Sequence, residues 1–176
     1  MQDFSRLLLE LLMKTIPLQM NNKTFLYSST AMIQHFKVRK KVDLPMEKAE
    51  AVTKLLFEVL KVQQIDFIIT RNCLASICEL AQGLDWCIDD QSSLQLLLTL
   101  IQIHSNEQKK LNIRLSCLKL IRFFAKKDGK VKEFMGSCGA VETVLQIVQA
   151  KRNQCKSMKI CVTFKSRLSS IFLRSL

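Results

Sequence analysis

The sequence predicts an all-α protein, a short right-handed α-solenoid in which pairs of helices stack one after another. The chain has 176 residues but only four glycines and two prolines, too few for the many turns of a β-sandwich or barrel. Leucine is the main apolar residue and is often flanked by lysine and glutamine, which favours helix. The third observation is that apolar positions recur every 44 residues along the chain.

This repeat consists of two sets of equivalent positions. The first set aligns Thr30 with Leu74 and Leu118 and, three residues later, Ile33 with Ile77 and Ile121. The second set aligns Leu12, Leu56, Leu100 and Val144, and three residues later Thr15, Val59, Ile103 and Ile147. Two independent sets with one period indicate two helices in each repeat. Stacking successive pairs then buries the apolar stripe that a single pair would expose.

Within each segment the apolar residues recur at intervals of three and four, as in amphipathic helices. We expect helices over residues 4–16, 24–37, 47–62, 66–82, 92–104 and 111–126, a short helix near 130–136, and a last helix over 140–150. Asp66 and Ser92 are suited to cap the starts of two helices, and Pro45 precedes a third. Gly83 and Gly129 suit the left-handed turn that follows a helix.

The composition changes at residue 150. We expect residues 1–150 to form about three repeats, and residues 151–176 to form a basic tail that is weakly helical or disordered. This tail holds seven of the 27 basic residues and none of the 15 acidic ones. The first repeat begins in its middle and the last lacks a recognisable partner helix, whereas solenoids need capped ends. A fragment or splice form of a longer array is therefore an open alternative to a complete one.

The cysteines and the charges predict a cytoplasmic or nuclear location. Seven cysteines are an odd number, and charged residues interrupt the apolar start of the chain, so we expect reduced thiols and no secretory signal. No apolar run is long enough to span a bilayer. Cys73, Cys78 and Cys117 lie in or beside the apolar stripes, where we expect them to pack as small hydrophobic residues.

The segment Cys138 to Val148 reads CGAVETVLQIV and resembles the armadillo repeat family. The likeness lies in a Gly-Ala-Val start to a helix rich in Leu and Val, preceded by a short helix and by a longer one that ends at Ala125. It covers residues 90–150 well and residues 1–90 through the period alone. Because a 44-residue unit is long for that family, a looser HEAT-like geometry remains the alternative.

The resemblance implies a binding scaffold whose groove is lined by the last helix of each repeat. Importin-like members carry a Trp and an Asn there, but the matching pairs in this chain are Ala31 with His35, Ala75 with Glu79, and Lys119 with Phe123. Their mode of holding peptides is therefore not expected. The residues that we predict to contact a partner are His35, Glu79, Lys119, Arg122, Phe123, Lys126 and Lys127, with Phe123 as the apolar anchor.

A second candidate is the basic loop formed by Lys37, Arg39, Lys40 and Lys41, which could bind phosphate or acidic side chains. The same residues could equally be solvated loop lysines or a nuclear import signal. Trp86, the single tryptophan, is expected to fill a seam between repeats.

No catalytic, metal-binding or cofactor-binding motif is found, so we expect neither an enzyme nor a cofactor. The predicted function is that of a protein-binding scaffold or adaptor. Its partner would be a helix or an extended segment of another protein, acidic if it contacts the predicted lysines. The alternative is binding to nucleic acid or to an anionic membrane through the basic loops and tail. The sequence leaves the oligomeric state open.

Overall fold

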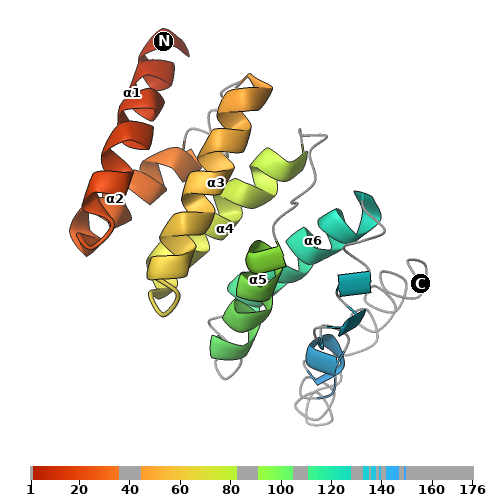
Figure 1. The fold of residues 1–176 in the computed structure, drawn as a ribbon. Coiled ribbons are helices and arrows are strands. Elements are labelled where there is room, and N and C mark those ends of the chain that lie inside the picture. The colour runs from red at the N-terminus through yellow and green to blue at the C-terminus, as the bar shows by residue number, and fades with distance from the viewer. Residues whose placement is uncertain are drawn as a thin grey trace, which may run out of the picture.

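The computed structural model describes residues 2–35, 45–82, 91–104 and 111–127, together with 133–134, 136–137, 139, 142–146 and 149. This part of the chain contains helices and no strand, so the all-α prediction is confirmed. The elements are α1 (Gln2–Thr15), the 3-10 helix η1 (Ile16–Gln19), α2 (Lys23–Gln34), α3 (Met46–Val62), α4 (Phe67–Gln82), α5 (Gln91–Ile103) and α6 (Leu111–Lys127) (Figure 1). Each of these α-helices coincides with a predicted one to within three residues at either end.

Local chemistry explains several helix boundaries. Pro17 lacks the N–H that would continue α1, and the chain tightens there into η1, which the periodicity did not predict. Asn22 caps α2, since its Oδ1 accepts a hydrogen bond of 3.1 Å from the backbone N–H of Phe25. Pro45 directly precedes α3, as predicted. The predicted cap at Ser92 is wrong, because α5 already begins at Gln91 and Ser92 lies in its first turn.

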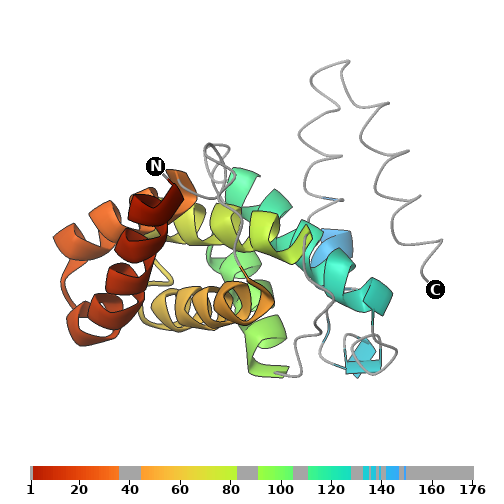
Figure 2. The same ribbon diagram turned by 90° about the horizontal axis from the view of Figure 1, so that it is seen from above.

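The helices form three successive units along the chain: α1, η1 and α2; then α3 and α4; then α5 and α6. In the second and third units the two helices of a unit pack against each other. Neighbouring units pack through α2 on α4, α4 on α6, and α3 on α5. Figure 1 shows α1 and α2 at one side of the molecule, α3 and α4 next to them, and α5 and α6 beyond these; Figure 2 shows the same helices from above.

Six hydrogen bonds between units, all within the described ranges, join residues that lie 38 to 43 positions apart. The pairs are Glu10–Lys48, Met20–Gln63, Tyr27–Asp66, Thr30–Asn72, Gln64–His104 and Cys78–Ser116. Because each separation is shorter than one 44-residue period, each bond connects a residue to the unit that follows it.

The core follows the predicted repeat. Equivalent positions in successive units are buried together, as in Thr30, Leu74 and Leu118, in Ile33, Ile77 and Ile121, and in Leu12, Leu56, Leu100 and Val144. The positions aligned with Val59 depart from this rule. Val59 is fully buried, whereas Thr15 is half-buried and Ile103 is exposed.

The cysteines confirm the packing prediction. Cys73 and Cys117 are fully buried and Cys78 is half-buried. Burial raises the pKa of all three thiols, that of Cys78 to about 11, because removal from water disfavours the thiolate. At neutral pH these side chains are therefore protonated and behave as apolar packing groups.

Several predictions fall on other parts of the chain. Gly83, Gly129, Trp86 and the basic tail over residues 151–176 lie outside the described residues. Among the described ones, Gly139 has a φ of 72°, a conformation that favours glycine, and its carbonyl accepts hydrogen bonds from Thr143 N and Oγ1 at 3.0 and 2.9 Å. These bonds join Gly139 to the helical residues 142–146.

Candidate binding face and corner pocket

One candidate surface lies on α2, α4 and α6, which pack side by side. His35 follows the end of α2 and is exposed, Glu79 is exposed on α4, and Lys119 and Lys126 are exposed on α6. The 44-residue register places His35, Glu79 and Phe123 at equivalent positions of the three helices. We call this surface, made of His35, Glu79, Lys119, Arg122, Phe123 and Lys126, the helix face.

Phe123 is half-buried and not fully exposed, and it packs against the core. Its ring meets that of Phe124 edge to face, with centroids 5.6 Å apart and an interplanar angle of 77°. Phe124 is buried, as the register predicted. Because its ring is already held by these contacts, Phe123 would lose little conformational freedom on binding a partner.

Two arginines on α6 are partly or almost fully removed from solvent. Arg114, for which the sequence analysis made no prediction, is only 8% exposed. The Nε atoms of Arg114 and Arg122 are buried without a hydrogen-bond partner within the described ranges. Arg122, predicted as a surface cation, is half-buried. Its guanidinium therefore sits at the border between the helix face and the core.

The remaining predicted contact residues cannot be placed on this face. The side chain of Lys127, at the end of α6, lies outside the described residues. The same holds for the whole predicted basic loop of Lys37, Arg39, Lys40 and Lys41.

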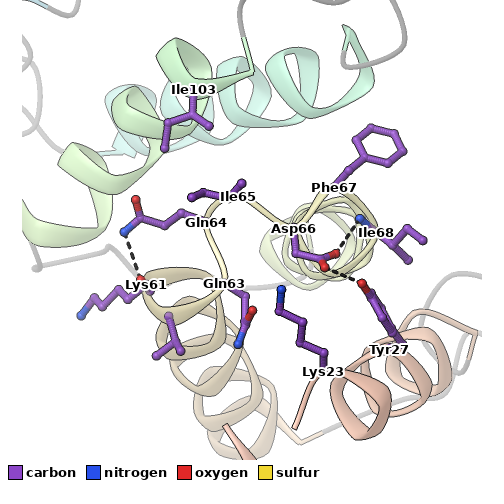
Figure 3. Close-up of a pocket in the computed structure, with 11 residues that line it drawn as sticks. Lys23, Tyr27, Lys61, Gln63, Gln64, Ile65, Asp66, Phe67, Ile68 and Ile103 are labelled. Atoms are coloured by element: carbon purple, nitrogen blue, oxygen red, sulfur yellow. Dashed lines mark hydrogen bonds between the residues drawn. The ribbon is translucent and has the colours of Figure 1, made fainter. Parts of the chain in front are cut away.

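A second candidate site was missed by the sequence analysis. It is a pocket of about 860 Å³ at the corner between α3 and α4, which we call the corner pocket (Figure 3). The start of α2, the end of α3, residues 63–66, the start of α4 and the end of α5 line it, so all three units contribute. Along α2 and α4 it lies at the opposite end from His35 and Glu79.

The corner residues 63–66 are bonded to the units on both sides. Gln63 Nε2 donates to the carbonyl of Met20 at 3.0 Å in the first unit. The carbonyl of Gln64 lies 3.0 Å from His104 Nε2 in the third unit, and His104 is fully buried. The walls of the corner pocket are therefore fixed by contacts with both neighbours.

Asp66 connects the pocket to α4 and α2. Its Oδ1 accepts hydrogen bonds of 3.1 Å from the backbone N–H groups of Ile68 and Ile69, which makes it the N-cap predicted from the sequence. Its Oδ2 accepts a 2.5 Å hydrogen bond from the hydroxyl of Tyr27. This hydrogen bond raises the pKa of Tyr27, and burial and the negative charge of Asp66 act in the same direction.

The pocket carries exposed aliphatic side chains. Their exposed fractions are 82% for Ile65, 51% for Val62, 44% for Ile68 and 39% for Ile103. One signal in the sequence could have indicated them. Ile65 stands in a short helix–helix connection, where polar residues and glycine are the rule.

Comparison with known proteins identifies no relative: no family model, no curated protein and no solved structure matches this chain. Within the ranges that the structure describes, no three His, Cys, Asp or Glu side chains gather to hold a metal ion. The described helices include none with the length and apolar character needed to cross a membrane. The helix face and the corner pocket are thus the two surfaces on which a functional proposal can be based.

Proposed function

We propose that this chain is a non-enzymatic protein-binding scaffold, an α-solenoid of armadillo- or HEAT-like units whose helix face binds a segment of another protein. The observation that carries the proposal is the packing between neighbouring units, α2 on α4, α4 on α6 and α3 on α5, together with the bonds that join residues 38 to 43 positions apart within the described ranges. Helices gathered about one centre would also bring together residues at much larger separations. Bonds between successive units are what a linear stack requires.

The stacked arrangement supports a binding role because it repeats exposed positions across a broad surface. Helices α2, α4 and α6 are neighbours, and the 44-residue register sets their outer residues in rows. Solenoids use such extended surfaces to hold helices or extended segments of partners. The face needs no catalytic group for this function.

The side chains of the helix face indicate the chemistry of the partner. Phe123 provides a pre-positioned apolar anchor, and Lys119, Arg122 and Lys126 surround it with positive charge on the same helix. Central aromatic residues with a charged rim are typical of protein interfaces. We therefore propose an acidic helix or extended segment with an apolar residue directed at Phe123.

Photo-crosslinking in cell extract tests this proposal. A photoreactive amino acid is placed at Glu79 or at Lys119, both exposed on the helix face, and at Gln95, exposed on α5, as the matched control. We expect the same protein to be crosslinked from positions 79 and 119 and not from position 95. Equal yields from all three positions, or no adduct from the face, would contradict a binding role for this surface.

Salt dependence separates this function from its competitor, the binding of nucleic acid or anionic membrane. The competing function is supported by the composition of residues 151–176, with seven basic residues and no acidic one. A phosphate-driven complex weakens steeply with salt, whereas apolar burial at Phe123 does not. An undiminished crosslinking yield when the irradiation is carried out at high salt, with no binding to generic DNA or anionic vesicles at low salt, supports the scaffold.

A further inference from the structure

The corner pocket has features of a preformed binding site that is separate from the helix face. Its wall at residues 63–66 is held from both sides, by the bond of Gln63 to Met20 and by that of Gln64 to His104. At the start of α4, Asp66 accepts hydrogen bonds from the backbone N–H groups of Ile68 and Ile69. Since these polar groups are already paired, an incoming ligand meets mainly the aliphatic side chains.

These aliphatic side chains come from two units. Val62 at the end of α3, Ile65 in the connection and Ile68 at the start of α4 belong to the second unit, and Ile103 at the end of α5 belongs to the third. In Figure 3 Ile65 and Ile103 lie on one side of the start of α4 and Ile68 on the other. The equivalent of Ile103 in the preceding unit, Val59, is fully buried by its neighbours. The apolar position that is buried in the second unit is therefore exposed to solvent at Ile103 in the third.

The charges around the pocket favour an anionic ligand. Lys23 lines the pocket as the first residue of α2, and no ion pair to it is formed within the described ranges. The first turn of α2 contains no acidic residue, so the positive end of its dipole adds to the charge of Lys23. Lys61 also lines the pocket, but its Nζ is ion-paired with Glu58 Oε1 at 2.7 Å, so Lys23 is the cation that carries this argument. The one lining carboxylate, Asp66, is already bound by Tyr27 and by two backbone N–H groups.

We propose that the corner pocket binds an acidic segment of a partner protein that inserts one Leu, Ile or Phe side chain against Ile65 and Ile103. A carboxylate next to the inserted residue pairs with Lys23. The apolar contact provides most of the affinity, and the ion pair selects acidic over basic segments. This site is independent of the helix face, so either can fail its test without the other.

The first test is selection from a phage-displayed library of random peptides on the full chain. We expect enrichment of sequences with Asp or Glu beside a single Leu, Ile or Phe. Binding of a selected synthetic peptide is then measured by calorimetry. Its site is read from the ring resonances of Tyr27, which lines the pocket and is the single tyrosine of the chain.

Substitutions in the pocket should weaken this peptide. Ile65→Ser removes an exposed side chain, so the fold should be retained, and we expect affinity to fall about tenfold. Lys23→Glu should lower affinity roughly threefold to tenfold at low salt and less at high salt. The matched control is Leu18→Ser in η1, which is 80% exposed but does not line the pocket, and which should bind like the wild type.

Several results would overturn the proposal. The first is that selection enriches basic peptides or enriches no peptide at all. The second is that the Ile65→Ser and Lys23→Glu variants bind the peptide as the wild type does. The third is that the Tyr27 resonances do not shift on binding. Loss of affinity in the Leu18→Ser control would show non-specific apolar adhesion. A concentration-dependent dimer in sedimentation that Ile65→Ser abolishes would assign the pocket to a second copy of the chain and not to an acidic partner.

Discussion

The most informative perturbation is truncation of one equivalent core position in each unit. Ile33, Ile77 and Ile121 stand 44 residues apart and are 2%, 0% and 1% exposed. The reasoning that predicted the stack from the sequence treats them as one site repeated three times. Replacing each by alanine in turn therefore tests both the burial of the repeat and the linear order of the units.

The magnitude follows from the burial. Isoleucine to alanine removes three carbon atoms from a position closed to solvent, which corresponds to roughly 2.4 kcal/mol of lost transfer free energy. The cavity left behind adds to this, so we expect a loss of ~3 kcal/mol in the free energy of unfolding, within the range for such substitutions. The largest loss is expected at Ile77, because α4 packs against α2, α3 and α6.

Urea denaturation followed by circular dichroism measures these losses. Glu79→Ala and Lys119→Ala, on the exposed sides of α4 and α6, serve as controls and should change stability by less than about 0.5 kcal/mol. Losses of that small size at Ile77 or Ile121 would mean that the apolar stripe lies on the wrong side of its helix.

Hydrogen exchange tests the order of the units, which the denaturation midpoint alone does not. In a linear stack each unit is stabilised by its immediate neighbours. Ile33→Ala should therefore speed exchange most in α1 and α2, less in α3 and α4, and least in α5 and α6. A uniform increase across all six helices would refute the stacked arrangement and favour one cooperative core.

Three further predictions concern single groups. Asp66→Ala should lower the free energy of unfolding by about 1 kcal/mol, because α4 loses its N-cap, whereas Asp66→Asn should lower it less, because asparagine can still cap. Urea denaturation measures both losses, and equal losses would contradict the capping role. The same Asp66→Asn change should let Tyr27 ionise at lower pH, since the neighbouring negative charge is gone, and absorbance of the tyrosinate measures this. Native-state alkylation mapped by mass spectrometry should leave Cys73 and Cys117 unmodified, with Cys78 slow; rapid labelling of either buried thiol would contradict the packing.

Much of the fold could be predicted because the information is local and repeated. Period-three and period-four spacing locates each helix, and the 44-residue register identifies Leu56 with Leu100, or Ile77 with Ile121, as equivalent buried positions. The N-cap at Asp66 was also predictable, because a cap depends on the few residues after it.

The corner pocket was not predictable by the same reasoning, because it depends on where helices end relative to one another. The register assigns Ile103 to the core with Val59, yet α5 ends at Ile103 and the side chain stays 39% exposed. Periodicity describes which side of a helix faces inward, whereas pockets arise where three units meet and the repeat is incomplete.

The two surfaces are related through α4, which runs from one to the other. Ile68 at the corner pocket and Glu79 on the helix face are eleven residues apart on this helix, or ~16 Å at 1.5 Å per residue. An extended peptide covers that distance with about five residues. One acidic segment lying along α4 can therefore reach both the lysines of α6 and Lys23 of α2, and its length decides whether the two sites are used together. A partner of this kind would lose affinity in the Ile65→Ser and Lys119→Ala variants alike, whereas a partner of the helix face alone would respond only to the second.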